Sequence, residues 1–277
     1  MKFTKMQGCG NDYVYVNCFV EKIENPAELA RKVSNRNFGI GSDGLILICP
    51  SEVADVEMVM YNADGSRSQM CGNGIRCVGK YAYDYGLVDK EVITVETLAG
   101  IKTLQLEVID GKVKNVTVDM GAPVLTAEKI PVIAEKEELI EYPVSVGGKE
   151  YFLTCVSMGN PHAVTLVEDT DSLELEKIGP EFEHHAMFPE RVNTEFIQVI
   201  NPQEIKMRVW ERGSGETLAC GTGACASAYA CMITGKTEKE VVVHLLGGDL
   251  RIRYDEATGH IFMTGPAVVV FEGGYVE

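Results

Sequence analysis

The chain has 277 residues, of which 45% are hydrophobic and 24% charged, so it can form one large or two medium folded domains. Its formal net charge of -16 repels phosphate backbones, and no run of Lys and Arg offsets it, so we expect no nucleic-acid partner. The N-terminus lacks the apolar core of a secretory signal, and no apolar stretch reaches the roughly 18 residues that span a bilayer. We therefore expect a cytoplasmic protein that does not enter membranes.

The cysteines argue for free thiols. Their number is odd and the expected compartment is reducing, so a disulfide framework is not predicted. No two are spaced as C-x-x-C, so neither a zinc site nor a thioredoxin-like motif is expected. Most should therefore be small buried apolar side chains. The nine are Cys9, Cys18, Cys49, Cys71, Cys77, Cys155, Cys220, Cys225 and Cys231.

Short β-branched runs recur along the chain, and many are bounded by Gly, Asn, Asp or Pro, which is typical of strands. In chain order they are Tyr13–Val16, Leu45–Cys49, Val56–Tyr61, Val92–Val95, Lys102–Ile109, Val113–Met120, Phe152–Ser157, Ala163–Val167, Thr194–Val199, Ile205–Trp210, Glu240–His244, Leu250–Tyr254 and Ile261–Thr264. The apolar stretches Gly39–Pro50 and Pro266–Phe271 are also predicted as strands.

Helix signals are fewer and lie apart from one another. Asn25-Pro26 precedes Ala27–Val33, which indicates a cap, a first-turn proline and a helix. Ser172 precedes Leu173–Ile178 and indicates a second capped helix. Because strands outnumber these spaced helices, the predicted class is α+β.

A long internal repeat relates the two halves of the chain. A shift of 149 residues brings unusual segments into coincidence: Gly10-Asn11 with Gly159-Asn160, Cys71-Gly72 with Cys220-Gly221, Gly74 with Gly223, and Gly86 with Gly235. Four separated matches at one offset predict two similarly folded halves. We expect the halves to face each other across a cleft, because domain interfaces are the usual place for a ligand pocket.

Cys71 and Cys220 each stand before the glycine-rich start of a predicted helix, within Met70–Cys77 and Ala219–Ala226. A helix N-terminus offers unpaired amides that bind anions, and its dipole favours a thiolate. Inverting an amino-acid α-carbon needs a base on one face and an acid on the other, which a thiolate and a thiol can supply. The pattern predicts such a pair, with helix-start amides stabilising the substrate carboxylate as it gains enolate character.

Several segments resemble the diaminopimelate epimerase family of cofactor-independent two-cysteine epimerases and racemases. They are Gly8–Tyr13, Tyr61–Ser66, Met70–Arg76, Gly159–His162, Arg191–Glu195, Trp210–Gly213, Glu216–Gly223, Met263–Pro266 and Phe271–Gly273. The resemblance covers the whole chain, and the paired cysteine loops with both asparagine motifs make it specific.

The resemblance implies two pseudo-symmetric domains, each a curled mixed β-sheet around a central α-helix. The halves would be residues 1–120 plus 266–277, carrying Cys71, and residues 121–265, carrying Cys220. It implies epimerisation of LL-diaminopimelate to meso-diaminopimelate without pyridoxal phosphate or metal, in lysine and peptidoglycan precursor synthesis. It also implies a homodimer, and a last strand that returns to the first domain.

Site residues follow from the resemblance position by position. Cys71 and Cys220 would be the acid/base residues, with His162 and Glu211 flanking the thiols. The substrate-binding residues would be Asn11, Asn62, Gly72, Asn73, Asn160, Asn193, Glu211, Arg212, Gly221 and Thr222. Among these, the amides of the two helix starts would hold the reacting carboxylate. Arg212 would bind the distal carboxylate through a planar two-pronged contact.

The repeat is broken at informative positions. Glu211 matches Asn62, and His162 matches Tyr13, as binding of an asymmetric substrate would require. Asn193 matches Gly44, where many family members carry a substrate-binding Gln. A backbone group or water would have to replace that amide here.

Four other readings stay open on the sequence. The first is a racemase of the same kind acting on proline, hydroxyproline or histidine. The second is the phenazine-biosynthesis isomerase group, whose members share the fold but lack the paired cysteines. The third is a dinucleotide-binding module, because Gly221–Ala226 fits G-x-G-x-x-A, although a polar loop precedes it where that motif needs a buried strand.

The fourth reading is non-catalytic: a redox sensor that uses Cys71 and Cys220. If the chain is an epimerase, we expect oxidation of these two thiols to inactivate it reversibly.

Overall fold

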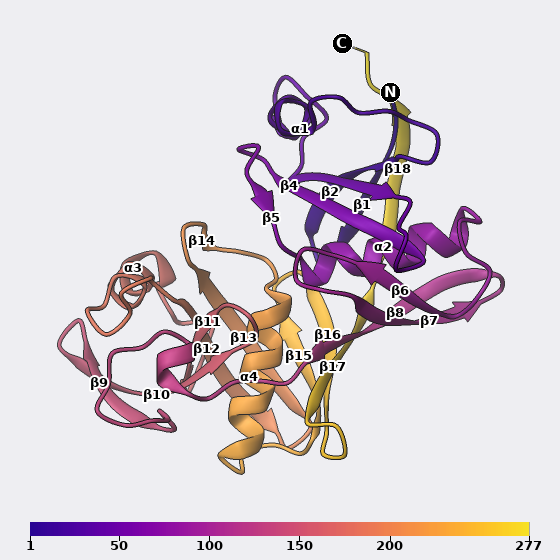
Figure 1. The fold of residues 1–277 in the computed structure, drawn as a ribbon. Coiled ribbons are helices and arrows are strands. Elements are labelled where there is room, and N and C mark those ends of the chain that lie inside the picture. Colours follow the sequence, from indigo (N-terminus) through magenta and orange to yellow (C-terminus); the bar gives the residue numbers. More distant parts are fainter. Residues whose placement is uncertain (277) are drawn as a thin grey trace. The chain divides into compact units, whose positions relative to one another are not determined.

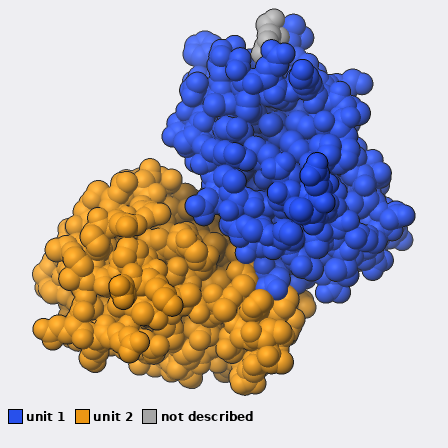
Figure 2. Space-filling model, in the orientation of Figure 1, with its two compact units in different colours: residues 1–119, 264–277 blue, residues 120–263 orange. Residues whose placement is uncertain are grey.

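The computed structural model describes residues 1–276, so Glu277, the end of the expected N-terminal half, lies outside the described residues. The chain divides into two compact units, Met1–Asp119 with Thr264–Glu277 and Met120–Met263 (Figure 2). The architecture is α+β, as the sequence predicts: mixed sheets and, within the described residues, four α-helices. None of these helices is long and apolar enough to cross a membrane.

Unit 1 is built on a mixed sheet (Figure 1). Its strands are β1 (Lys2–Gly8), β2 (Asn11–Asn17), β3 (Gly44–Cys49), β4 (Val56–Asn62), β5 (Arg67–Ser68), β6 (Val92–Glu96), β7 (Lys102–Ile109), β8 (Lys112–Gly121) and β18 (Val268–Gly274). They pair in the order β18-β1-β2-β3-β4-β6-β7-β8, parallel at β2–β3 and β4–β6 and antiparallel elsewhere, with β5 added to β4.

Helix α2 (Gly72–Asp84) is the central helix of unit 1, because it contacts β1, β2, β4, β6 and β7. Its small residues allow this close packing: a Cβ on Gly79 would lie 2.8 Å from the Leu104 side chain. Helix α1 (Pro26–Ser34) lies against β2, β3 and β4 and buries Leu29, Ala30 and Val33. Proline occupies its first turn as predicted, but Asn25 at the N-cap makes no side-chain capping hydrogen bond.

Unit 2 has the same plan. Its elements are the 3-10 helix η1 (Ala127–Lys129), the strands β9 (Tyr142–Val146), β10 (Lys149–Ser157), β11 (Pro161–Leu166), β12 (Asn193–Asn201), β13 (Glu204–Glu211), β14 (Gly215–Glu216), β15 (Glu240–Leu245), β16 (Gly248–Asp255) and β17 (His260–Pro266), and the helices α3 (Leu175–Glu183) and α4 (Gly221–Ile233). Strands β9 to β13, β15 and β16 pair in that order, parallel at β11–β12 and β13–β15, with β14 added to β13.

The repeat extends to the elements themselves. A shift of 149 residues places α1 on α3 and α2 on α4, residue for residue. Helix α4 contacts β10, β11, β13, β15 and β16, the counterparts of the strands that α2 contacts in unit 1, and also β12. The two units differ in the strand that pairs with the outer side of β1 and of its counterpart β10. In unit 2 this strand is β9, which directly precedes β10, whereas in unit 1 it is β18 from the C-terminus.

Three local expectations need correction. Ser172 does not cap α3, which begins at Leu175 after an N-cap at Glu174 without a side-chain capping bond. Gly39–Pro50 is only partly strand, because the amides of Ile40 and Gly41 bond the Val33 carbonyl at the end of α1. The polar first strand β1 was not predicted, because its buried Lys5 is compensated by an ion pair with Asp12 on β2 at 2.6 Å and by a hydrogen bond to the carbonyl of Gly41, which is distant in sequence.

Candidate active site

The half-site of unit 1 begins at the N-terminus of α2. Cys71 is the N-cap residue, with φ -131° and ψ 121°, and its Sγ accepts a hydrogen bond from the Gly74 amide at 3.3 Å. This is the arrangement that a capping side chain makes, with sulfur in place of oxygen. The helix start predicted from the glycines therefore positions the thiol.

Asn11 accepts a hydrogen bond from the Cys71 thiol. The Cys71 Sγ lies 3.1 Å from Asn11 Oδ1, and Asn11 Nδ2 donates to Asp43 Oδ2 at 2.7 Å. Asp43 is paired in turn with Arg36 at 2.9 Å. Because the Asn11 amide is held from its nitrogen side, its oxygen is fixed toward the sulfur.

The groups around Cys71 have opposite effects on the pKa of its thiol. Burial raises the pKa of the Cys71 thiol, whereas hydrogen bonds from the amides of Gly74 and Asn73 and from Tyr13, with the charge of Arg76, lower it. Burial also raises the pKa of Tyr13 well above its usual range, so Tyr13 stays a protonated donor. These polar groups favour the thiolate, but burial outweighs them, and the pKa of Cys71 lies above its usual value.

Arg76 is a structural support of this loop that the sequence analysis did not single out. It is fully buried, and its guanidinium donates to the Gly72 carbonyl at 3.1 Å and to the Pro266 carbonyl at 3.2 Å. It thereby ties the first turn of α2 to the returning C-terminal segment. A signal was present, because a charged residue stands in an otherwise apolar helical run.

The half-site of unit 2 repeats the same backbone frame. Cys220 is the N-cap of α4, with φ -118° and ψ 110°, and its Sγ accepts from the Gly223 amide at 3.3 Å. The side chain of Thr222 lies 3.5 Å from the sulfur, where unit 1 has Asn73. Cys220 is buried, with 6% of its surface exposed, whereas Cys71 is half-buried.

The charges around Cys220 are carboxylates. Burial, Glu211 and Glu195 together raise the pKa of Cys220 well above its usual range, while Thr222 and Gly223 lower it. Burial likewise raises the pKa of Glu211, whose carboxylate accepts from the Thr217 hydroxyl. The thiol form is therefore favoured at Cys220.

Glu195 is the residue that sequence reasoning missed. Its Oε1 lies 2.7 Å from His162 Nδ1, and both side chains are fully buried. Its Oε2 has no hydrogen-bond partner within the described part of the chain. The other ring nitrogen, His162 Nε2, lies 2.9 Å from Asn160 Oδ1, so the imidazole is held from both sides.

The repeat carried a signal for Glu195. Its counterpart in unit 1 is Ile46, a core residue whose Cδ1 would lie 2.7 Å from a Cβ on Gly74. In unit 2 the Glu195 carboxylate occupies this place, 2.6 Å from a Cβ built on Gly223. Burying a charged group costs free energy, so a carboxylate at a core position of the repeat, packed under the thiol loop, signals a functional role.

Three of the remaining predicted residues, Asn193, Arg212 and Asn62, make hydrogen bonds within their own unit. Asn193 is buried, and its amide is engaged within the unit: Nδ2 donates to the Pro161 carbonyl at 2.8 Å, and Oδ1 accepts from the Arg212 amide at 2.9 Å. The Arg212 guanidinium donates to the Glu190 carbonyl at 3.0 Å. Asn62 donates to the Ser66 hydroxyl at 3.0 Å. Asn193 therefore positions the Arg212 backbone.

The glycine at position 44 has a packing reason. A Cβ there would lie 2.2 Å from the Tyr61 carbonyl oxygen and 2.9 Å from the Tyr13 ring. Strands β3 and β4 approach too closely at this point for any larger residue. The departure from the family pattern is therefore built into the backbone of unit 1.

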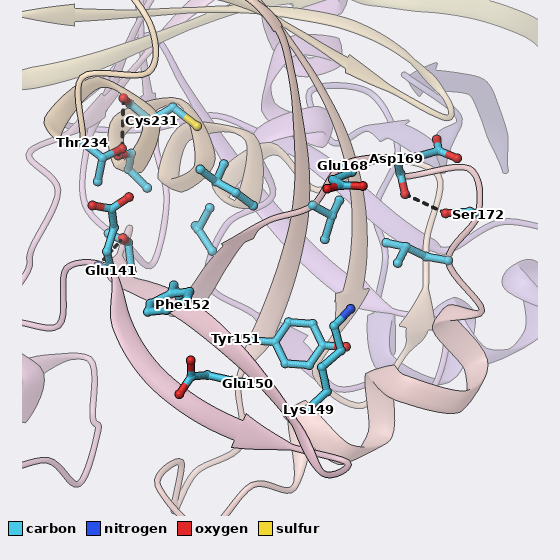
Figure 3. Close-up of a pocket in the computed structure, with 16 residues that line it drawn as sticks. Glu141, Lys149, Glu150, Tyr151, Phe152, Glu168, Asp169, Ser172, Cys231 and Thr234 are labelled. Carbon is cyan, nitrogen blue, oxygen red and sulfur yellow. Dashed lines mark hydrogen bonds between the residues drawn. The ribbon is translucent and has the colours of Figure 1, made fainter.

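A cavity of about 810 Å³ lies elsewhere in unit 2, between β10, β11 and the C-terminal end of α4 (Figure 3). None of the predicted site residues belongs to its described lining. Ala230 and Thr234 line it, at the positions where unit 1 has Tyr81 and Tyr85. Those two tyrosine rings stack at 4.1 Å in unit 1, so the cavity reflects small residues where the repeat has large ones.

Comparison with known proteins identifies the family of the chain. The family model described as diaminopimelate epimerase matches residues 3–126 and 154–270. A protein of Acetivibrio thermocellus named diaminopimelate epimerase is 62% identical over 273 residues, covering 99% of this chain and 98% of the relative. A protein of that name from Methanococcus maripaludis is 57% identical over 273 residues, covering 99% of both chains.

Solved structures with low identity share the fold. A Bacillus anthracis phenazine biosynthesis protein of the PhzF family has a TM-score of 0.72 at 18% identity, covering 100% of this chain and 99% of its own. A hydroxyproline epimerase from Agrobacterium vitis has a TM-score of 0.69 at 14% identity, covering 99% and 91%. These two likenesses concern architecture, whereas the family is decided by the matches along nearly the whole sequence. This chain belongs to the diaminopimelate epimerase family.

Proposed function

We propose that the chain converts LL-diaminopimelate to meso-diaminopimelate by inverting one α-carbon with Cys71 and Cys220. The names of relatives at 51 to 62% identity support the substrate. The observation that carries the mechanism is the repeated N-cap geometry. Each thiol lies at a helix start, and its sulfur accepts a hydrogen bond, 3.3 Å long, from the amide three residues later in the chain.

The chemistry balances without a cofactor. One thiolate takes the α-proton, and the opposite thiol delivers its own proton to the other face, so the two sulfurs exchange protonation states. The substrate carboxylate gains enolate character while the α-carbon lacks its proton. Amides of the first helical turns stabilise that charge, at Gly72 and Asn73 in unit 1 and at Gly221 and Thr222 in unit 2.

The surroundings divide the roles of the two sulfurs in the resting enzyme. Burial raises the pKa of both thiols, but Glu211 and Glu195 raise that of Cys220 further, whereas amide donors, Tyr13 and Arg76 lower that of Cys71, so Cys71 is the one that loses its proton more readily. The ligand-free enzyme is then ready to deprotonate substrate at Cys71 and to protonate at Cys220. Which stereoisomer this serves depends on the substrate orientation.

Glu195 and His162 act as positioning residues in this proposal. Their 2.7 Å contact, with Asn160 on the far ring nitrogen, holds the imidazole beside the Cys220 loop. Glu211 supplies a second carboxylate that flanks the thiol and contacts substrate. Asn11, Asn62 and Arg212 read the rest of the substrate, with the Arg212 guanidinium on the distal carboxylate.

The family resemblance further supports a homodimer in the cytoplasm, where a reducing environment keeps both thiols active. Sedimentation of the purified chain at several concentrations tests the assembly. A species with twice the mass of one chain is expected, and a monomer at all concentrations would contradict it.

Deuterium exchange tests the reaction itself. Reduced protein is incubated with LL-diaminopimelate in deuterated water without added cofactor, and proton NMR follows the α-proton while chiral chromatography identifies the product. Exchange with formation of the meso isomer is expected. If the folded protein leaves diaminopimelate untouched but turns over proline, hydroxyproline or histidine, the substrate assignment is wrong.

A further inference from the structure

A second pair of thiols lies in unit 1, at the opposite ends of β2 and β3 from the Cys71 half-site. The parallel register pairs Asn17 with Ile48, so the next residues, Cys18 and Cys49, stand opposite each other. The Cys18 amide donates to the Ile48 carbonyl at 2.8 Å, which continues the ladder to this point. Both side chains are half-buried, so small reagents can reach them.

The backbone spacing suits a covalent bond between these sulfurs. Neighbouring strands lie about 4.8 Å apart, and the Cα atoms of disulfide-bonded cysteines are usually about 4.4 to 6.8 Å apart. Directly opposite residues of a parallel pair project to the same face of the sheet, and each of the two thiols is the largest influence on the pKa of the other, as close neighbours are. The register therefore gives the two cysteines a backbone spacing that a disulfide can bridge.

The two thiols differ in their readiness to lose a proton. The hydrogen bond from Cys49 lowers the pKa of Cys18, although burial and the carboxylates of Glu21 and Glu57 oppose this. The same bond, with burial, raises the pKa of Cys49 far above its usual range. Cys18 is thus the nucleophile of the pair and Cys49 the proton-bearing partner.

The fold does not require thiols at these positions. In unit 2 the matching residues are Val167 and Gln198, and the Val167 amide makes the same bond to the Ile197 carbonyl at 2.8 Å. Gln198 there accepts from Thr170 at 3.3 Å. The same backbone therefore accommodates an apolar and an amide side chain, so the dithiol is an addition confined to unit 1.

We propose that Cys18 and Cys49 form a redox-active dithiol, a modification site separate from Cys71 and Cys220, that hydroperoxides convert to an intramolecular disulfide. The Cys18 thiolate attacks a peroxide oxygen, the O–O bond breaks, and Cys18 becomes a sulfenic acid with release of hydroxide. The Cys49 sulfur then attacks Cys18, the S–O bond breaks, and the second hydroxide leaves. Two thiols and one hydrogen peroxide give one disulfide and two waters.

The test is a cysteine map of the full chain after limited oxidation. Reduced protein is treated with one equivalent of hydrogen peroxide, free thiols are alkylated, and the digest is analysed by mass spectrometry with and without dithiothreitol. A Cys18–Cys49 disulfide is expected to exceed every other oxidised cysteine species in amount, and the reductant should reverse it. Cys71 or Cys220 oxidised while Cys18 stays fully alkylated would overturn the proposal.

Matched variants assign the two roles. In Cys49→Ser, the Cys18 sulfenic acid should persist and be trapped by dimedone, whereas Cys18→Ser should leave Cys49 unoxidised. Cys231→Ser, which removes a buried thiol of unit 2, is the control and should keep the Cys18–Cys49 bond. Equal dimedone labelling of Cys49 in Cys18→Ser would reject Cys18 as the nucleophile. This readout is independent of catalysis, so it stands or falls separately from the proposed epimerase activity.

Discussion

The two cysteine loops share a backbone frame and differ in the charges that surround the sulfur. Both thiols cap a 13-residue helix and accept an amide at 3.3 Å. Cys71 faces Asn11, Tyr13 and Arg76, whereas the matching region of unit 2 holds Glu195, Glu211 and His162. The comparison teaches that a repeat can keep its geometry while side chains at a few positions shift the pKa of each thiol to a different extent.

Removal of either sulfur should have the largest effect on the reaction, because it leaves only one of the two thiols. Cys71→Ala and Cys220→Ala each delete one of the two proposed proton-transfer groups, and such a group contributes about 10² to 10⁴ in rate. We expect kcat for epimerisation to fall by at least about a hundredfold in each variant. Chiral chromatography of product measures this, with circular dichroism as the control for folding. If either variant keeps more than half the wild-type rate, that sulfur is not part of the reaction.

Glu195→Gln should reduce the difference between the two thiols. Loss of the charge lowers the pKa of Cys220, because the carboxylate raises it, and leaves His162 without its carboxylate partner. We expect kcat to fall about tenfold or more, and Cys220 to be alkylated at lower pH than in the wild type.

The pH profile distinguishes this from loss of structure. Cys71 serves as the internal control, since its alkylation profile should not move. Glu195→Asp, which restores the charge, should return the Cys220 profile toward that of the wild type. An unchanged Cys220 profile in Glu195→Gln would show that the carboxylate does not act on the thiol.

The ligand-free wild type should already show the asymmetry. Alkylation requires thiolate, and the carboxylates raise the pKa of Cys220, whereas the polar neighbours of Cys71 lower its pKa against the effect of burial. As pH rises, Cys71 should therefore react with iodoacetamide before Cys220 does, by several-fold in rate near neutrality. Peptide-resolved mass spectrometry gives both profiles in one sample. The reverse order would invert the assignment of thiolate and thiol.

Gly44→Gln should have the smallest effect on chemistry and a clear effect on stability. Its Cβ would lie 2.2 Å from the Tyr61 carbonyl oxygen, so the strands must separate, at a cost of about 1–3 kcal/mol. Urea unfolding should show a lower midpoint than in the wild type. Gly86→Ala, whose Cβ meets nothing within 4 Å but whose φ is +72°, is a control for backbone strain alone.

Local patterns carried most of the fold and of the thiol loops. Alternation and turn residues predicted most strands, and glycines after each cysteine predicted helices that begin at Gly72 and Gly221. Spacing alone revealed the repeat, which the structure reproduces as α1 on α3 and α2 on α4. These features are readable because helix starts, turns and periodicity depend on residues near one another in the chain.

Only the tertiary structure decided which side chains meet. Nothing local marks Glu195 as the partner of His162, 33 residues earlier, or explains why Gly44 must stay small beside Tyr61. Strand β1 was not predicted because its buried lysine is tolerated through Asp12 on the next strand and through the carbonyl of Gly41, 36 residues later. Burial and close approach are set by pairing between distant segments, so the sequence by itself determined the frame of each half-site, and tertiary packing decided its charges.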